Sequence, residues 1–389
     1  MTTLRPAQSL AAAWLSTRKR GCVVAPAGSG KTVIAAGALD LVLKKRTREK
    51  PPKIGWLANT IEQCVQAQMA ITGFAIDADV KIACAAANTD WSDRDCLVID
   101  EAHHATAPGW AEQIATCKGA LWGFTATPWT GDEERDAALK VLFGEFHTIE
   151  RSEVSHTLAP AAVRFLNASD DVGMLIDEKV EKDMKWRERY WKRSETEQWK
   201  RVLWDKKSTA EQILEANAKL RGIYQELRGQ VCWQACVEIG IVNNTARNEA
   251  AIVAARKHTE PTLILVNQVE HAKWFAETLP NAVACFSKMG KKKRATALQD
   301  FRDGKVQRLV ATSLADEGLD LPMASVLILV SGGRSEAKTI QRTGRVLRRH
   351  EGKGTAVIYD FSDLQHQLMA KHSRKRREIY EELGYAVES

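Results

Sequence analysis

The sequence predicts an α/β protein with two parallel-sheet lobes and a helical insertion between them. In the first part of the chain, short apolar runs alternate with helix-like segments, and the same alternation returns from residue 262. Between about 172 and 240 the alternation stops, and Lys, Arg, Glu and Trp dominate. Strands buried in parallel sheets read as continuous apolar runs joined by helical crossovers. We therefore expect a first lobe at 1–157 and a second at 158–389 that contains the insertion.

The expected strands are the apolar runs of each lobe. They cover 21–25, 53–58, 96–100 and 120–127 in the first lobe, and 262–266, 283–286, 308–312, 326–330 and 356–360 in the second. Helix-like segments at 32–45 and 60–70 follow two of them. In the insertion we expect one or more long helices with five tryptophans, at 186, 191, 199, 204 and 233. Helix packing is the expected use of most of them, and stacking on bases is the alternative because Lys and Arg interleave with three.

Composition sets the class of protein. A chain of 389 residues predicts two or three domains, and 44% hydrophobic with 27% charged residues excludes a collagen-like or wholly disordered chain. The net charge of +7 is compatible with an anionic partner. Eight scattered cysteines without a CxxC pair predict reduced thiols and no structural zinc. No run of about 18 apolar residues is present, so we expect no membrane span.

The segment 25–32, APAGSGKT, has the pattern of a phosphate-binding loop between a strand and a helix. Backbone N–H groups of Ala27, Gly28, Ser29 and Gly30 can converge on phosphate oxygens at the helix N-terminus. Lys31 would then contact the β- and γ-phosphates, and the Thr32 hydroxyl would bind Mg²⁺. The alternative is a glycine turn followed by an exposed lysine.

Two successive carboxylates, Asp100 and Glu101, lie at the end of the apolar strand at 96–100. Their side chains point in different directions, so they can have different roles. Asp100 suits a Mg²⁺ ligand, and Glu101 suits the group that orients or deprotonates an attacking water. An acidic helix N-cap is the alternative.

These two motifs predict a nucleoside triphosphatase. The whole series of motifs resembles that of superfamily 2 helicases of the DEAH type. Segments in the family's order lie at 4–8 (LRPAQ), 25–32 (APAGSGKT), 100–103 (DEAH), 125–128 (TATP), 266–268 (VNQ), 310–322 (VATSLADEGLDLP) and 341–348 (QRTGRVLR). Ala7 departs from the family pattern, which usually has an aromatic residue there. The resemblance implies two tandem RecA-like lobes, with the insertion between motifs III and IV.

The resemblance also implies roles for individual residues. Arg5 and Gln8 would bind the nucleotide, with Gln8 reading adenine, and Gly318, Asp320 and Gln341 would contribute from the second lobe, the first two near the ribose. Arg345 and Arg348 would reach across the cleft to the γ-phosphate, where an arginine finger contributes about 10³ to 10⁵ in rate. A simple arginine-rich helix is the alternative for this segment. The residues expected to couple hydrolysis to domain movement are His103, Thr125 and Thr127.

The expected partner is a nucleic acid, with DNA favoured over RNA. Phosphate contacts from backbone and hydroxyl groups at the tops of both sheets are expected, and simple loop capping is the alternative for the first-lobe pair. The candidates are Asn59, Thr60, Asn267, Thr312 and Ser313. Residues 334–377 contain twelve basic and four acidic residues, and of these only 371–377 are candidates for contact with a nucleic acid backbone.

We therefore expect an ATP- and Mg²⁺-dependent DNA helicase or translocase. An RNA helicase, a motor subunit of a larger complex and a nucleotide-regulated scaffold with little turnover are the alternatives. The compact arrangement, without a nuclease motif, is similar to phage or mobile-element helicases. A cytoplasmic location in a bacterial or phage-infected host cell is the corresponding expectation.

Overall fold

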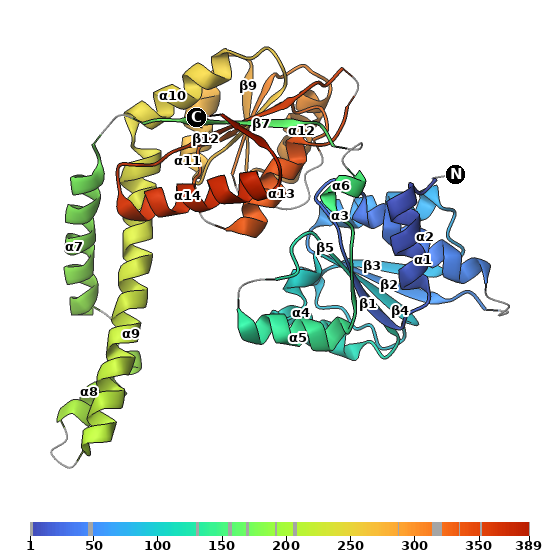
Figure 1. Ribbon diagram of the computed structural model, residues 1–389, viewed down its shortest axis with the longest axis horizontal. Helices are drawn as coiled ribbons and strands as arrows, with labels where there is room; N and C mark the ends of the chain where they lie inside the picture. Colours follow the sequence, from blue (N-terminus) through green and yellow to red (C-terminus); the bar gives the residue numbers. More distant parts are fainter. Residues whose placement is uncertain are drawn as a thin grey trace.

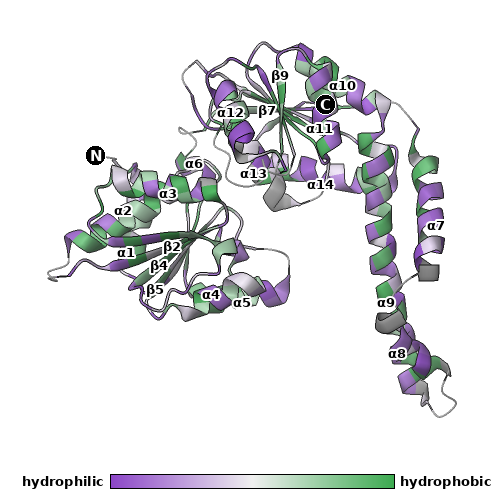
Figure 2. Ribbon diagram, turned by 180° about the vertical axis from the view of Figure 1, so that it is seen from behind, coloured by the Kyte–Doolittle hydropathy of each residue, from purple (hydrophilic) through white to green (hydrophobic). Residues whose placement is uncertain are grey.

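A computed structural model shows two parallel β-sheets, each flanked by helices, and a helical arm that extends away from the second sheet (Figure 1). The structure describes residues 3–45, 50–129, 132–154, 158–168, 171–190, 193–204, 208–286, 288–312, 321–333, 335–350 and 352–388. Hydrophobic residues concentrate in the strands of both sheets, as Figure 2 shows. The fold class predicted from the sequence is confirmed.

The first lobe contains a six-stranded sheet in the order β3-β2-β4-β5-β1-β6. Its strands are β1 (Arg20–Val24), β2 (Lys53–Ala58), β3 (Asp79–Cys84), β4 (Cys96–Asp100), β5 (Ala120–Thr125) and β6 (Phe146–Thr148). Its helices are α1 (Pro6–Ser16), α2 (Lys31–Lys44), α3 (Ile61–Gly73), η1 (Ala85–Ala87), η2 (Ala102–His104), α4 (Pro108–Thr116), α5 (Glu133–Phe143) and α6 (Arg151–Val154). Because all the strand pairs are parallel, the carboxyl ends of β4, β5 and β1 lie side by side at one edge.

The second lobe contains a seven-stranded parallel sheet in the order β13-β7-β12-β11-β8-β10-β9. Its strands are β7 (Ala161–Leu166), β8 (Thr262–Leu265), β9 (Ala282–Cys285), β10 (Arg308–Ala311), β11 (Val326–Leu329), β12 (Ala356–Phe361) and β13 (Ala386–Glu388). Its helices are α10 (Thr245–Arg256), α11 (Val269–Thr278), α12 (Lys291–Arg302), α13 (Glu336–Val346) and α14 (Gln367–Glu382).

The arm consists of α7 (Gly173–Tyr190), α8 (Arg193–Trp204) and α9 (Ala210–Ala235), and the π-helical segment η4 (Cys236–Val242) returns the chain to the lobe. Thr209 begins α9 with a capping box, in which its hydroxyl accepts a hydrogen bond from the Gln212 N–H. At the base of the arm, apolar side chains of α7 and α9 pack into the core of the second lobe. The arm is therefore anchored at one end and projects at the other.

Four strands of the described part of the chain were not predicted from the sequence. These are β3, β6, β7 and β13. β3 and β13 are edge strands, and their alternating or exposed side chains give no continuous apolar run. β7 precedes the arm in sequence but pairs with β12, which lies almost 200 residues later in the chain. No helix in the described part of the chain is long and apolar enough to cross a membrane.

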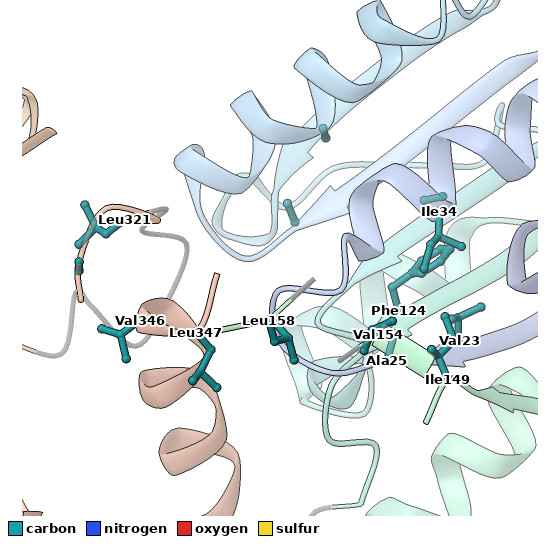
Figure 3. Packing of buried hydrophobic residues seen from close by; sticks show 14 of the residues in the cluster. Val23, Ala25, Ile34, Phe124, Ile149, Val154, Leu158, Leu321, Val346 and Leu347 are labelled. Carbon is teal, nitrogen blue, oxygen red and sulfur yellow. The ribbon is translucent and has the colours of Figure 1, made fainter. Parts of the chain in front are cut away.

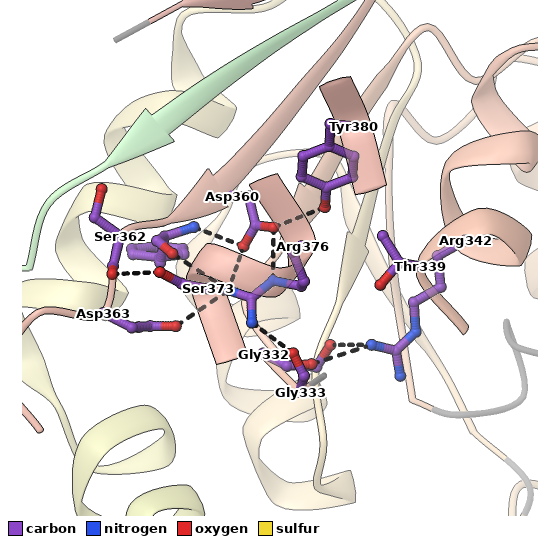
Figure 4. Close-up of polar contacts among 12 residues, drawn as sticks. Gly332, Gly333, Thr339, Arg342, Asp360, Ser362, Asp363, Ser373, Arg376 and Tyr380 are labelled. Carbon is purple, nitrogen blue, oxygen red and sulfur yellow. Dashed lines mark hydrogen bonds and ion pairs between the residues drawn. The ribbon is translucent and has the colours of Figure 1, made fainter. Parts of the chain in front are cut away.

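A buried ion network ties β12 to α14 in the second lobe (Figure 4). The Arg376 guanidinium donates two hydrogen bonds of 2.8 Å to the Asp360 carboxylate, and Arg247 pairs with Asp363. The Tyr380 hydroxyl also donates to Asp360, at 2.7 Å. Burial alone would raise the pKa of Asp360, but Arg376 and these hydrogen bonds hold it below its ordinary value.

This network corrects the expectation that all of 371–377 is available to a nucleic acid. Arg376 is 3% exposed and is neutralised by Asp360, and His372 and Ser373 are also buried. Part of the basic character of this segment therefore stabilises the fold and is not presented to a partner.

Replacing Asp360 by Ala should destabilise the second lobe strongly, because Arg376 would remain buried without its main counter-charge. Breaking a buried pair in this way costs about 3–5 kcal/mol. Urea unfolding followed by tryptophan fluorescence measures the change. The control is Glu378→Ala, which removes the exposed partner of Lys375 on the same helix and should cost less than about 1 kcal/mol. Equal, small losses in the two variants would contradict the assigned role of the network.

Candidate active site

The loop between β1 and α2 has the conformation of a phosphate-binding loop. Gly28 and Gly30 have φ angles of +84° and +86°, in the left-handed region where a side chain is strained. The Ser29 N–H donates to the Pro26 carbonyl at 3.1 Å and closes the turn. α2 begins at Lys31, so its first N–H groups lie beside this turn. The geometry offers an anion both backbone donors and a helix N-terminus.

The side-chain amide of Gln8 is hydrogen-bonded to this loop. Its Nε2 donates to the Ser29 carbonyl at 2.7 Å, and its Oε1 accepts from the Arg5 N–H at 3.0 Å. A Cβ at Gly30 would collide with the same Nε2. Gln8 therefore acts on the loop directly, whereas adenine recognition by Gln8 and nucleotide binding by Arg5 stay predictions.

Asp100 lies at the end of β4, next to the ends of β5 and β1. It is 7% exposed, and its Oδ1 accepts a hydrogen bond from the Glu101 N–H at 3.0 Å. Burial and then the negative charge of Glu101 raise the pKa of Asp100 to about 7, whereas Lys31 opposes the shift. A divalent cation would favour the ionised form of this carboxylate further.

Glu101 has an unusual backbone and an unsatisfied side chain. Its φ of +51° places a non-glycine residue in the left-handed region, a strain that persists only where the surroundings enforce it. Its Oε2 is buried, 3.5 Å from His103 Nδ1, and accepts no hydrogen bond from the described residues. Ser29 Oγ in the loop is likewise buried without a partner among these residues. Both atoms suit a site that is completed by a bound ligand.

His103 connects the carboxylate pair to the end of β5. His103 Nδ1 lies 3.0 Å from Thr125 Oγ1, and Thr125 Oγ1 in turn accepts from the Thr127 N–H at 3.2 Å. Burial lowers the pKa of His103 to about 4, against the opposing effect of the Glu101 charge. The imidazole is therefore neutral near pH 7. The three residues expected to couple hydrolysis to movement form one hydrogen-bonded chain.

The second lobe contacts the loop directly through the C-terminal end of α13. A Cβ at Gly344 would overlap the Cβ of Ala27, and a Cβ at Gly28 would lie 3.3 Å from Arg348 Cγ and 3.8 Å from its Nε. Arg348 thus passes over the glycine turn. Sequence reasoning predicted the arginine, but it missed the glycine that allows the approach.

Leu158, at the junction of the two lobes, also contacts the loop, because a Cβ at Gly28 would lie 3.2 Å from Leu158 Cδ2. Residues 158 and 348 form an antiparallel bridge, and the Ala159 N–H donates to the Leu347 carbonyl at 2.6 Å. Figure 3 shows the side chains of Leu158, Val346 and Leu347 in the apolar cluster that runs from the first lobe into the second. No motif marked Leu158, because its role depends on a partner 190 positions away in the chain.

Several predicted residues have no described side chain. Ser313, Gly318 and Asp320 lie outside the described residues. Gln341 and Arg345 belong to α13, but their side chains are outside the described part of the structure. Their assignments stay predictions.

The predicted nucleic acid contacts divide into capping and groove residues. Thr60 caps α3 by accepting from the Gln63 N–H at 3.2 Å, and the Asn59 N–H donates to the Gln63 side chain at 3.0 Å. Thr312 is buried at the end of β10. Asn267 donates to the Ser331 carbonyl at 2.7 Å and lines a groove of about 840 Å³ between the second lobe and α9.

Residues from the arm also line this groove, and sequence reasoning did not place them there. Trp233 and Gln230 of α9 face Asn267 and Arg342 of the second lobe. Arg342 donates to Ser331 Oγ at 2.9 Å. The basic motif at 341–348 signalled Arg342, but nothing in the sequence indicated which side of the arm lies against it.

Comparisons with known proteins agree with this arrangement. The family "Helicase conserved C-terminal domain" matches residues 245–350, and "Type III restriction enzyme, res subunit" matches residues 2–94. The chain is 23% identical over 382 residues to the "DNA 3'-5' translocase XPB2" of Sulfurisphaera tokodaii, covering 94% of this chain and 82% of that protein. It is 35% identical over 125 residues to "Putative helicase 22" of a Sulfolobus islandicus filamentous virus, where the match covers 31% of this chain and 22% of the relative.

The fold also has a solved counterpart. The helicase domain of Hef from Pyrococcus furiosus superposes with a TM-score of 0.51 at 16% identity, covering 92% of this chain and 96% of that one. This likeness supports tandem RecA-like lobes. It concerns the fold alone.

Replacing Gly344 by Ala should slow ATP turnover and leave the stability of the fold nearly unchanged. Alanine in a helix interior is favoured over glycine by about 1 kcal/mol, but its methyl group would push α13 away from Ala27 and displace Arg348. A misplacement of about 1 Å at a reacting centre can cost about 10²-fold in rate. We expect thermal melting close to that of the unmodified chain and at least tenfold slower ATP hydrolysis. Gly222→Ala in α9 is the control, since a Cβ there meets nothing within 4 Å; equal turnover in both variants would contradict the tight inter-lobe contact.

Proposed function

We propose that the chain, which matches helicase family models in both lobes, is a superfamily 2 helicase that hydrolyses ATP and uses this hydrolysis to translocate on DNA. The activity would unwind or remodel branched or duplex DNA in replication, recombination or repair. The observation that carries the proposal is the position of Arg348, which comes from the second lobe and lies over Gly28 of the phosphate loop in the first. Hydrolysis at such a site depends on how the lobes are placed, which is the basis of a motor.

The residues of the first lobe fit a magnesium–nucleotide complex. The glycine turn has positive φ angles and can surround a phosphate group. The buried Ser29 Oγ and Glu101 Oε2 make no hydrogen bond to the described protein groups, so both are available to a ligand. Thr32 and Asp100 would hold Mg²⁺. The ion supplies neutralisation of charge on the phosphate oxygens.

The protein groups have distinct proposed roles around the triphosphate. N–H groups of 27–30 and the Lys31 ammonium bind phosphate oxygens, and Glu101 orients the attacking water. Arg348, with Arg345 three positions before it in the sequence, stabilises the negative charge that develops in the transition state. The nucleotide contacts of Arg5, Gln8, Gly318, Asp320 and Gln341 remain part of the same proposal.

The coupling chain supports a link between hydrolysis and movement. Glu101 lies beside His103, and His103 shares a hydrogen bond with Thr125 at the end of β5. A change at the carboxylate after hydrolysis would therefore reach the segment 125–127 through two contacts. In this proposal, the segment 125–127 is where the contacts of the first lobe with the second lobe or with DNA would change.

One comparison favours DNA as the nucleic acid on which the chain moves, and one groove suits a single strand of nucleic acid. The relative that aligns over 94% of this chain carries the name of a DNA translocase. The groove between α9 and the second lobe offers Asn267, Arg342 and Trp233, a combination of polar, cationic and aromatic groups that suits a single nucleic acid strand. Contacts of Asn59, Thr60, Thr312 and Ser313 with the backbone are part of this proposal.

Stimulation of ATP hydrolysis by different nucleic acids tests the function. Rates are measured with single-stranded DNA, duplex DNA, forked DNA and RNA of matched length at one fixed salt concentration. We expect the largest stimulation with DNA. Strongest stimulation by RNA would overturn the DNA proposal, and ATP binding without stimulation by any nucleic acid would favour a scaffold.

Glu101→Gln should abolish turnover and preserve binding. The amide keeps the shape of the side chain but cannot orient or deprotonate water as a carboxylate does, so we expect hydrolysis to fall by about 10²- to 10⁴-fold. Equilibrium binding of ATP and DNA should change little. Glu112→Gln, an exposed glutamate of α4, is the control. Normal turnover by the Glu101 variant would refute the assignment.

Arg348→Ala should slow hydrolysis while ATP still binds. The guanidinium acts mainly on the charge of the transition state, so the loss should appear in kcat rather than in KM. Arg256→Ala, which removes an exposed arginine of α10, should leave both constants unchanged. Weaker ATP binding in step with slower turnover would show a ground-state role instead.

A further inference from the structure

Three potential metal ligands meet where the arm joins the second lobe. Cys232 lies in the last turns of α9, Cys236 begins η4, and His366 directly precedes α14. Their ligand atoms all lie within 4.8 Å of one another, in a group found among the described residues. All three side chains are buried or half-buried, and both cysteines are free thiols.

The spacing of these atoms suits one tetrahedral ion. Zinc–sulfur bonds of about 2.3 Å and a zinc–nitrogen bond of about 2.0–2.1 Å place sulfur and nitrogen about 3.5 Å apart in a tetrahedral site. Cys236 Sγ and His366 Nδ1 are 3.5 Å apart. The C-x₃-C separation of the two cysteines places both thiols on one face of the helical segment and lies within the range seen in zinc sites.

The other nitrogen of His366 has the partner that a metal-bound histidine usually has. His366 Nε2 lies 3.4 Å from Asp177 Oδ1 of α7. A carboxylate behind the ring orients the imidazole and makes the opposite nitrogen a better ligand. Nδ1 accepts from the Leu368 N–H at 3.2 Å, and coordination would replace this cap of α14 with a metal bond.

A route from solvent reaches the same group. A cavity of about 960 Å³ is lined by Asp177, Cys232 and His366, together with Gly229 and Gln365. It supplies both an entry path and room for a water molecule at a fourth coordination position. Thiolate and imidazole ligands select zinc over magnesium or calcium, which prefer oxygen.

We propose that Cys232, Cys236 and His366 bind one Zn²⁺ ion, with water at the fourth position and Asp177 behind His366. The two thiols release their protons to solvent on binding, so the ion and two thiolates are together neutral. Because the cysteines belong to the base of the arm and His366 to the lobe, the ion fixes the arm on the second lobe. This site differs from the magnesium site of the first lobe and reverses the sequence-based expectation of no structural zinc.

Metal content and cobalt substitution of the full-length chain test the proposal. Under reducing conditions at neutral pH, the purified protein is dialysed with zinc, freed of excess metal and analysed by mass spectrometry for bound zinc. A parallel sample with Co²⁺ is examined by absorption spectroscopy. We expect one metal ion per chain, thiolate-to-cobalt charge-transfer absorption, and a melting temperature that rises with zinc.

Variants separate this site from adventitious binding. Cys232→Ser and His366→Asn should each lower zinc affinity by more than tenfold and lose the zinc-dependent rise in melting temperature. Cys84→Ser, which changes another half-buried free thiol in the first lobe, is the matched control and should bind zinc normally. Circular dichroism establishes that each variant is folded. Absence of bound metal in the unmodified chain, or binding that is unchanged in both ligand variants, would overturn the proposal.

Discussion

The close packing of Gly344 against Ala27 is the contact on which the active site depends. Only glycine lets the C-terminal end of α13 approach the phosphate loop so closely, and this approach places Arg348 over Gly28. In the proposed mechanism, the first lobe would contribute the phosphate-binding loop, Asp100 and Glu101, whereas Arg348 of the second lobe would supply the cation for the transition state. On this proposal neither lobe would hold a complete site, so a movement that separates the lobes would interrupt hydrolysis.

The second lobe holds α13 in position through buried polar contacts. Arg376 binds Asp360 on β12 and also donates to the Gly333 carbonyl at 2.6 Å, in the turn after β11 (Figure 4). Arg342 of α13 donates to Ser331 in the same turn. Since the groove beside Asn267 is lined by this turn and by α9, the proposed nucleotide site, the proposed DNA groove and the base of the arm are connected through this turn.

The sequence predicted those features that are local in the chain. The phosphate loop, the carboxylate pair and the long apolar strands are each formed by residues that are contiguous in the chain, so they can be predicted without knowing any distant contact. Features that depend on distant pairing were missed: β7 finds its partner β12 across the arm, Leu158 meets Arg348, and Cys236 meets His366. Arg376 was misread because a basic run gives no sign of which member faces a buried Asp360.

Binding of a transition-state analogue tests most directly whether Arg348 of the second lobe completes the site. ADP with aluminium fluoride resembles the charge distribution of the transferring phosphoryl group, and ADP alone does not. We expect the unmodified chain to bind the analogue far more tightly than ADP. In Arg348→Ala, the ratio of analogue affinity to ADP affinity should fall by about 10³-fold, while the affinity for ADP itself is unchanged. An undiminished preference in Arg348→Ala would show that the second lobe does not complete the site.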